Sequence, residues 1–348
     1  MGKHTVIAVD IAKSVFEIAE SEEPGRVSRR RRVTRAQFLR VFTNREPVEV
    51  VMEACGSAHH WGRELQALGH TATLLPPRHT RAYRMGSKTD RTDTDAVLEA
   101  RRNERIRPVP VKTLNQQSLG FLHRARTAWI HTRTQRLNAI RGILREFGVS
   151  IPVGAARVLP ALRSALEAGT VPETVHPILL EFANEIRELD KRILDCQKQI
   201  QRVGKETPGV QEMRSIPGVG SLVSTALASS VVDPNRFPSG RHMAAFIGLV
   251  PQEFSSGNKR RLGSITKSGD PYPRTMLIHG ARSVLIAAKK SNHNDYLRTW
   301  ALNLEKRIGH NKAAVALANK IARIAWACWS KHTLYQSRPI TTKAPEIS

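Results

Sequence analysis

The sequence is poor in acidic and aromatic residues. Only 30 Asp and Glu residues stand against 55 Lys and Arg residues, which gives the 348-residue chain a formal net charge of +25. Such an excess of positive charge indicates a polyanionic partner, with nucleic acid ahead of an anionic membrane surface. Trp, Tyr and Phe make up only 5% of the chain. Base stacking is therefore not the expected mode of binding, and contacts to the phosphate backbone should dominate.

Cysteines and long apolar runs are also scarce. Cys55, Cys196 and Cys328 are far apart and form no C-x-x-C pair, so neither a disulfide framework nor a zinc site is indicated. No apolar run approaches the roughly 20 residues that span a bilayer. The N-terminus has the pattern of a strand rather than that of a signal peptide. These absences favour a protein of the reducing cytoplasm that does not enter a membrane.

Against this basic background, three carboxylates fall within six residues. The stretch 88–96 (KTDRTDTDA) contains Asp90, Asp93 and Asp95 and leads into a segment with the apolar stripe of a helix. Asp90 and Asp93 are one helical turn apart, so both can point the same way and offer hard oxygen ligands to Mg²⁺. The alternative is that they only cap the helix N-terminus, which the helix dipole also favours.

The first 112 residues alternate between strand and helix patterns. Apolar and β-branched runs predict strands over 5–10, 13–20, 27–33, 48–53 and 71–75, and helices are predicted after Thr34, after Ser57 and over the acidic stretch. This order is that of a mixed α/β sheet that begins with a meander. The arginines at 29–32 in the third strand fit either a solvated edge strand or a phosphate-contacting patch.

Two of the predicted strands end in an acidic residue, Asp10 and Glu53. Functional groups of open α/β sheets gather at strand ends, so these carboxylates meet if the two strands are neighbours. Asp90 and Asp93 would then complete a site of four carboxylates. Such a site suits two divalent ions that activate a nucleophile and stabilise the leaving oxygen of a phosphodiester. Taken singly, each acid also fits a solvent-facing strand end.

Two long helices are predicted next. The first starts at the capping-box pattern 113–116, runs to about Phe147 and carries arginines between its apolar positions. Its unbalanced charge favours a nucleic-acid-facing side over an ordinary solvated face; the candidates are Arg126, Arg133, Arg136 and Arg141. The second helix, within 172–204, has mixed charges that suit a coiled-coil surface. The pair forms either an antiparallel hairpin or a dimerisation arm.

The remaining chain contains a glycine turn and a basic loop. Gly218 and Gly220, in 216–220 (IPGVG), would let backbone N–H groups approach a phosphate at a helix N-terminus; a plain tight turn is the alternative. In 254–270, small residues alternate with bases, and the phosphate-binding candidates are Lys259, Arg260, Arg261 and Lys267. Helices are predicted over 274–289 and 312–329, and the polar tail from 336 is predicted to be disordered.

Ser256 precedes Gly257 in this loop and would be sterically open. A serine in that position can act as a nucleophile toward phosphorus if a base or a metal ion activates it. The alternative is a flexible phosphate-binding loop in which the serine has no covalent role.

Taken together, these motifs resemble the DEDD-type insertion-sequence transposases related to the Piv and MooV site-specific invertases, which are bridge-RNA-guided recombinases. The matching segments, in order, are Asp10, 51–56 (VMEACG), 88–93 (KTDRTD), 216–220 (IPGVG), 246–251 (FIGLVP), 255–259 (SSGNK) and 263–270 (GSITKSGD). They extend over nearly the whole chain.

The resemblance implies a domain order and a chemistry. The implied parts are an RNase H-like (RuvC-like) domain over 1–112, a coiled-coil arm over 113–205, a mostly helical transposase domain with a helix-hairpin-helix element over 206–335, and the tail 336–348. It also implies Mg²⁺ bound by the DEDD tetrad, here Asp10, Glu53, Asp90 and Asp93. Ser256 is the implied nucleophile, with adjacent Ser255 as the alternative, and it would form a covalent phosphoserine link to DNA. Asp95 is a fifth acid that could join or replace a tetrad member.

The implied partners are double-stranded donor and target DNA, a structured non-coding bridge RNA that pairs with both, and further copies of the chain in a homodimer or homotetramer with composite sites. The implied location is the nucleoid of a prokaryotic cytoplasm. A RuvC-like nuclease that hydrolyses branched DNA is the runner-up, and it would need the acids but not Ser256. A non-catalytic nucleic-acid-binding protein would need neither. An actin-like ATPase is disfavoured because the chain is far too basic.

Overall fold

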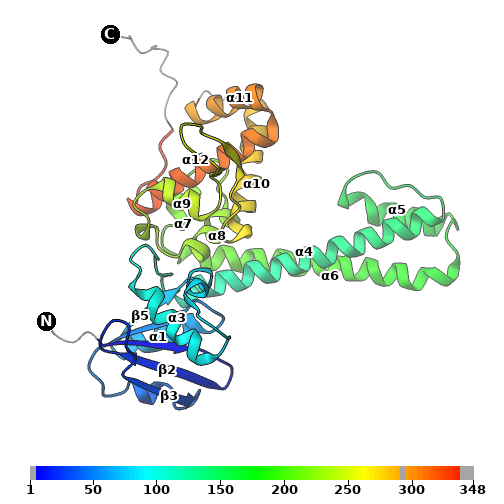
Figure 1. The fold of residues 1–348 in the computed structure, drawn as a ribbon. Coiled ribbons are helices and arrows are strands. Elements are labelled where there is room, and N and C mark those ends of the chain that lie inside the picture. Colours follow the sequence, from blue (N-terminus) through cyan, green and yellow to red (C-terminus); the bar gives the residue numbers. More distant parts are fainter. Residues whose placement is uncertain (1–4, 291–294, 338–348) are drawn as a thin grey trace, which may run out of the picture. The chain divides into compact units, whose positions relative to one another are not determined.

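The computed structural model describes residues 5–290 and 295–337, and the chain divides into two compact units, 1–114 and 115–348 (Figure 1). Each unit has hydrophobic clusters of its own. The segments predicted as a helical arm and as a transposase domain belong to the same unit, so their separation into two domains stays a prediction. Most of the predicted disordered tail, residues 338–348, lies outside the described residues.

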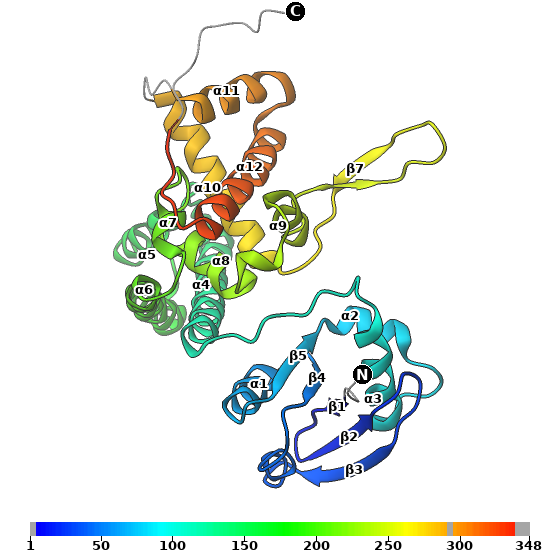
Figure 2. The ribbon, with the colours of Figure 1, turned by 90° about the vertical axis from the view of Figure 1, so that its left-hand side faces the viewer.

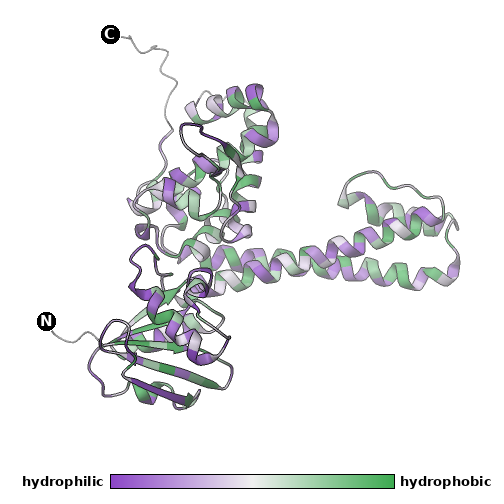
Figure 3. Ribbon diagram, viewed as in Figure 1, coloured by the Kyte–Doolittle hydropathy of each residue, from purple (hydrophilic) through white to green (hydrophobic). Residues whose placement is uncertain are grey.

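The first unit is built on a five-stranded mixed sheet in the order β3-β2-β1-β4-β5. The strands are β1 (Val6–Asp10), β2 (Val15–Ser21), β3 (Arg29–Thr34), β4 (Glu49–Glu53) and β5 (Thr71–Leu75). The first three form an antiparallel meander, whereas β4 and β5 run parallel to β1. The prediction of a mixed α/β sheet with an initial meander is confirmed. Figure 3 shows the interior strands largely hydrophobic and β3 largely hydrophilic.

One face of the sheet packs against α1 (Ala58–Ala67) and the segment between β3 and β4. Phe38 and Phe42 of that segment are buried, and the Phe38 ring meets the Trp61 ring edge-to-face at 5.1 Å between centroids. The helix predicted after Thr34 is wrong, because only a single 3₁₀ turn, η1 (Leu39–Val41), forms. The apolar spacing that suggested a helix instead serves to seat the two aromatic rings in the core.

The other face packs against α3 (Asp90–Arg102). Ala8 of β1 and Ala19 of β2 face the helix and are fully buried. These short side chains let the helix backbone approach the sheet closely. The chain reaches α3 from β5 through α2 (Pro77–Thr80) and the 3₁₀ turn η2 (Arg81–Tyr83).

The second unit is helical apart from one hairpin. Its helices are α4 (Leu114–Glu146), α5 (Val158–Glu167), α6 (His176–Lys205), α7 (Val210–Arg214), α8 (Ser221–Val231), α9 (Gly240–Phe246), α10 (Pro271–Lys290), α11 (Tyr296–Ile308) and α12 (His310–Ser330), with 3₁₀ turns η3 (Ala155–Arg157), η4 (Glu173–Val175) and η5 (Pro234–Arg236). Strands β6 (Pro251–Glu253) and β7 (Leu262–Ile265) form a hairpin that projects from the helices in Figure 2. The basic loop is therefore partly ordered.

Helices α4 and α6 run antiparallel. Leu119 near the start of α4 packs with Ile200 near the end of α6, while Leu144 near the end of α4 packs with Leu179 near the start of α6. Helix α5 packs at this second end through Leu162. Of the two arrangements left open by the sequence, the intrachain hairpin is present. Coiled-coil packing and a role in dimerisation stay predictions.

Helices α10 and α12 carry the central core of the second unit, where Leu277, Ala281, Leu317 and Ile321 are fully buried. The buried Arg274 of α10 donates to the carbonyl oxygens of Ile247 at 2.9 Å and Ser268 at 2.8 Å, which fixes the chain after β7. Within the described ranges, no helix has the length and apolar content to cross a bilayer.

A buried histidine joins α4 to this core. The Nδ1 atom of His123 lies 2.8 Å from the Tyr272 hydroxyl of α10, and its Nε2 atom lies 3.0 Å from the Thr225 hydroxyl of α8. Burial, aided by the charge of Arg126, lowers the pKa of His123 from 6.5 to about 4. His123 is therefore neutral in the folded protein at pH 7.

We expect folding stability to fall as pH falls from 6.5 toward 4, because the unfolded chain gains a proton at His123 before the folded protein does. This residue should contribute a loss of about 2 kcal/mol between pH 7 and pH 5. Urea unfolding at both pH values would measure it. His123→Gln should reduce this loss of stability. The loss that remains comes from other groups such as His59, because burial also lowers the pKa of His59 to about 4. His131→Gln, exposed on the same helix, should behave as wild type; equal pH dependence in both variants would contradict this account.

Candidate active site

Asp10 and Glu53 end neighbouring parallel strands. The register pairs Val9 of β1 with Met52 of β4, so the next residue of each strand lies at the same edge of the sheet. Side chains alternate along a strand. Asp10 therefore shares a face with Ala8, and Glu53 shares a face with Val51, which is the face that α3 covers. The sequence predicts that Asp10 and Glu53 meet only if their two strands are neighbours, and the structure places these strands side by side.

Helix α3 starts with the other two predicted acids. Thr89 is its N-cap: the Thr89 hydroxyl accepts from the Thr92 N–H at 3.2 Å, and the Thr92 hydroxyl accepts from the Thr89 N–H at 3.0 Å. Two threonines thus form a capping box. Asp90 and Asp93 lie in the first turn without acting as its side-chain cap. Capping alone does not account for these carboxylates.

Burial and the negative charges of the other three predicted acids act on Asp10 and raise its pKa. This pKa is raised from 3.8 to about 6, first by burial and then by the negative charges of Asp93, Asp90 and Glu53, whereas the charge of Lys88 acts against the rise. A carboxylate surrounded by like charges is stabilised by any cation that enters the cluster. Asp95 is not among the charges that raise this pKa.

The other three carboxylates are held by neighbouring side chains. Glu53 accepts from the Thr80 hydroxyl, Asp93 from Arg84 Nε at 2.5 Å and Asp90 from Arg32 Nη2 at 2.8 Å. In the part of the chain that the structure describes, no three His, Cys, Asp or Glu side chains converge as ligands of one ion. The donor chemistry fits a hard divalent cation, which Asp90 and Asp93 would bind in exchange for their arginines. These hydrogen-bond partners are not predicted from the sequence, although Arg84 stands just before the acidic stretch.

The arginine run of β3 is an edge strand tied to carboxylates. Arg30 binds Asp95 of α3, Arg31 binds Glu20, and Arg32 pairs with both Glu17 and Asp90. Three of the four arginines are thus paired with carboxylates within the first unit, on an edge strand. Contact of these arginines with phosphate stays a prediction. Arg30 also donates to the Thr94 hydroxyl at 3.1 Å, so Asp95 is held toward β3.

The β6–β7 hairpin carries both candidate serines. Ser256 begins a tight turn that the Lys259 N–H closes on the Ser256 carbonyl at 3.2 Å, with Gly257 at φ +56°. The Ser255 hydroxyl donates to Glu253 Oε1 at 2.7 Å. Both serines are exposed. Ser256 is therefore the serine of the open tip, and Ser255 is the serine held by a carboxylate.

Three of the four phosphate-binding residues predicted in this loop lie near these serines, and the fourth, Lys267, lies at the base of the hairpin. Lys259, Arg260 and Arg261 lie in the turn of the hairpin, Lys267 follows β7, and all four are exposed. Among the ion pairs of the described residues, only one involves these four bases: Arg260 Nε lies 3.6 Å from Glu253 Oε1. The hairpin tip is accordingly strongly positive.

Three of the four arginines predicted on α4 support the helical arm. Arg133 pairs with Asp190 of α6 at 2.5 Å, and Arg136 pairs with Glu185 of the same helix. Arg141 donates to the Gly154 carbonyl at 2.8 Å. These contacts give the three residues a part in holding α4, α6 and their connection together. Their binding of nucleic acid stays a prediction.

The fourth arginine lies beside the glycine turn. Arg126, Gly218, Gly220 and His279 help to line a hollow of about 580 Å³. Gly220 is the N-cap of α8, and Gly218 has φ +82°. The structure thus brings three predicted nucleic-acid-binding residues to one place at a helix N-terminus.

Gly218 also has a packing reason to be glycine. A Cβ atom there would lie 2.7 Å from the Gly280 carbonyl oxygen, whereas one at Gly220 would meet nothing within 4 Å. Gly218→Ala should therefore lower the free energy of unfolding by about 2 kcal/mol or more, and Gly220→Ala by about 1 kcal/mol at most. Chemical denaturation of both variants would measure this. Equal losses would show that the contact with Gly280 does not constrain the turn.

The first unit thus has acids at the ends of two parallel strands, β1 and β4, and at the start of helix α3. Residues 7–149 match a family model described as "Transposase", the DEDD transposase of IS110 elements. Residues 210–298 match the model of the "Transposase IS116/IS110/IS902 family". The chain belongs to this family of insertion-sequence transposases.

Curated relatives agree over almost the full length. The chain is 39% identical to a "Probable family 20 transposase" of Pseudomonas aeruginosa, over 95% of this chain and 98% of the relative. It is 38% identical to the "Transposase for insertion sequence element IS1111A" of Coxiella burnetii, over 95% and 91%. It is 30% identical to the "Transposase for insertion sequence element IS1328" of Yersinia enterocolitica, over 95% and 98%.

Proposed function

We propose that this transposase cuts and rejoins the DNA of its insertion element with a metal-binding acidic tetrad and a serine nucleophile. The proposal is supported by the parallel pairing of β1 with β4, which brings Asp10 and Glu53 to one edge of the sheet. It is also supported by Asp90 and Asp93 in the first turn of α3, whose charges help to raise the pKa of Asp10. Family membership supplies the transposase activity. The carboxylates supply a reason for divalent-metal dependence, which is general among DEDD transposases.

Mg²⁺ is the proposed cation because it prefers oxygen ligands and is usually bound by one or two carboxylates together with substrate phosphates. When bound, it would stabilise the negative charge that develops on phosphodiester oxygens during cleavage. The chain's own side chains prepare the site: Thr80 orients Glu53, Arg84 holds Asp93 and Arg32 holds Asp90. Once released by the carboxylates, the two guanidinium groups would be donors for a DNA phosphate.

The metal proposal predicts a difference between two aspartates. Asp10→Asn should weaken Mn²⁺ binding at least tenfold, because it removes a carboxylate from the centre of the cluster. Asp95→Asn should leave it within about twofold, because Asp95 pairs with Arg30. Electron paramagnetic resonance of free Mn²⁺ during titration would measure both. If Asp95→Asn gave the larger loss, Asp95 would replace Asp10 in the site.

The serine step conserves the energy of the cleaved bond. The Ser256 oxygen attacks phosphorus, and the bond from phosphorus to one deoxyribose oxygen breaks. The released deoxyribose oxygen takes up a proton. The serine proton passes to solvent or a nearby carboxylate. The resulting protein–DNA phosphodiester can be attacked by a deoxyribose hydroxyl in the reverse sense, so rejoining needs no external energy source. The open position at the hairpin tip favours Ser256 as the nucleophile, whereas the hydrogen bond to Glu253 favours Ser255.

The serine proposal predicts a covalent adduct. Incubating the protein with element-end DNA, Mg²⁺ and co-purified RNA should give a protein–DNA species that survives a denaturing gel. Ser256→Ala and, separately, Asp90→Ala should abolish this species while DNA binding persists. Ser164→Ala, an exposed serine on α5, is the matched control and should form the adduct normally.

The result with Ser255→Ala decides between the two serines. Adduct retained in Ser255→Ala and lost in Ser256→Ala supports Ser256, and the reverse pattern assigns the nucleophile to Ser255. Cleavage without any adduct would contradict the covalent mechanism and support hydrolysis by a RuvC-like nuclease acting on branched DNA. Family membership does not favour that alternative.

The proposed partners are donor and target duplexes and a bridge RNA that pairs with both. The positive hairpin tip and the turn at Gly220, read as a helix-hairpin-helix element with Arg126 beside it, supply phosphate contacts for them. We propose that the active assembly is a homodimer or homotetramer in which composite sites form. In the adduct experiment, digesting the co-purified RNA before adding DNA should abolish the adduct if RNA guides the reaction.

A further inference from the structure

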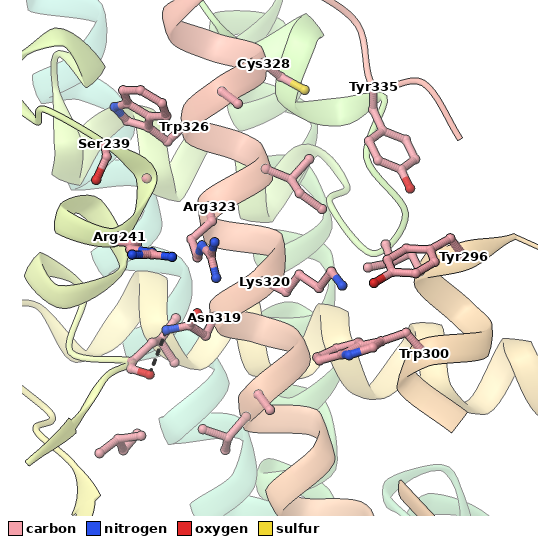
Figure 4. A pocket seen from close by; sticks show the side chains of 18 of the residues that line it. Ser239, Arg241, Tyr296, Trp300, Asn319, Lys320, Arg323, Trp326, Cys328 and Tyr335 are labelled. Carbon is pink, nitrogen blue, oxygen red and sulfur yellow. Dashed lines mark hydrogen bonds between the residues drawn. The ribbon is translucent and has the colours of Figure 1, made fainter. Parts of the chain in front are cut away.

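A groove of about 1570 Å³ in the second unit has no part in the mechanism proposed above (Figure 4). It runs along α12. Its other walls are the N-terminus of α9, the base of the β6–β7 hairpin, α11 and residues 333–336. Much of the lining is apolar, including Val315, Ile324 and Leu334. All of these segments belong to one compact unit.

The charged residues of the groove are all of one sign. Arg241, Lys312, Lys320 and Arg323 line it, and none of its described lining residues is Asp or Glu. Arg241, Lys312 and Arg323 are exposed. In Figure 4, the labelled Arg241 and Arg323 lie near one another, while Lys320 points toward α11. An apolar groove with a purely basic lining suits a ligand that is itself both apolar and anionic.

Aromatic residues are concentrated here. The chain has only five Trp and four Tyr residues, and two of each line the groove: Trp300, Trp326, Tyr296 and Tyr335. Trp326 also donates from Nε1 to the Pro234 carbonyl at 3.0 Å, which fixes its ring. Tyr296 is 48% exposed, so part of its ring is available to a ligand.

One cation is held against two of these rings. Lys320 Nζ lies 4.0 Å from the ring centroid of Trp300 and 4.5 Å from that of Tyr296. This cation–π contact orients both rings and keeps a positive charge beside them. An aromatic face with a cation next to it is the combination that binds a nucleobase and its phosphate together. A base pair inside a duplex does not expose its faces, so the ligand must be unpaired.

We propose that this groove binds a short unpaired stretch of nucleic acid, with bases stacked on Tyr296 and Trp300 and phosphates contacted by Lys320, Lys312 and Arg323. Pro251 and Ile265, at the base of the β6–β7 hairpin, also line the groove. A strand leaving it at that side continues onto the hairpin that carries Ser255 and Ser256. The binding proposal does not depend on which serine, if either, is the nucleophile, because it is tested without cleavage.

The first test measures binding of fluorescein-labelled 12-mers of deoxythymidine and of uridine, and of a 12-bp duplex, to the full chain by fluorescence anisotropy without divalent metal. Tyr296→Ala should weaken binding of the single-stranded probes about tenfold, and Tyr296→Phe should bind within about twofold of wild type because it keeps the ring. Binding of the duplex should be unchanged in both. The two single-stranded probes show whether the groove accepts DNA, RNA or both.

The matched control is Phe121→Ala, which removes a 56% exposed ring from α4, outside the groove. It should leave all three affinities unchanged. Trp300→Ala is not used, because the Trp300 ring is more deeply packed than the Tyr296 ring. Stacking on Trp300 is measured instead by the quenching of tryptophan fluorescence on adding the unlabelled 12-mer. This quenching should be lost in Trp300→Phe.

The second test concerns the phosphates. Lys312→Gln and Arg323→Gln should each lower the slope of log affinity against log salt by about 0.7 for the single-stranded probes, whereas Lys191→Gln, exposed on α6, should not. The proposal is wrong if Tyr296→Ala leaves single-strand binding unchanged, or if it weakens the duplex equally. It is also wrong if neither basic substitution in the groove changes the salt slope, in which case the groove holds a protein segment or no ligand.

Discussion

Burial of Asp10 beside three further carboxylates is the electrostatic constraint on which the proposed site of the first unit depends. Parallel pairing of β1 with β4 sets Asp10 beside Glu53, and the alanine-lined face of the sheet admits α3 with Asp90 and Asp93. Gathering four like charges costs free energy, part of which the hydrogen bonds from Arg84, Arg32 and Thr80 offset. The same cost makes the cluster attractive to a cation.

The large positive charge of the chain is divided between internal and external tasks. Arg133, Arg136 and Arg141 hold the helical arm, and the buried Arg274 fixes the segment after β7. Other bases face outward, among them those at the tip of the β6–β7 hairpin and in the groove along α12. Net charge therefore identifies the kind of partner but overstates how many arginines are available to it. Position in the fold decides which of them can meet a phosphate.

Strand ends and helix starts have strong local signals, so the sequence predicts Asp10 and Glu53 at the ends of strands that the structure pairs in parallel. The role of these acids as one site stays a prediction. Prediction from the sequence fails where distant packing decides. Phe38 and Phe42 have helical spacing but are drawn into the core, and α5, α11 and the β6–β7 hairpin are not anticipated. The groove is hidden for a further reason. Its aromatic residues come from three separate segments, so a low average aromatic content conceals a local concentration.

The contact between Gly218 and Gly280 joins the turn before α8 to the middle of α10 with backbone on both sides. A Cβ atom on Gly280 would lie 2.1 Å from the Gly218 carbonyl oxygen. Most contacts in a core can drift during evolution, because a larger side chain on one side is matched by a smaller one on the other. At this contact both residues are glycine, so neither has a side chain that could become smaller to make room for a larger partner. Proteins that keep this junction must therefore keep glycine at both positions, however much the sequences of the surrounding helices change.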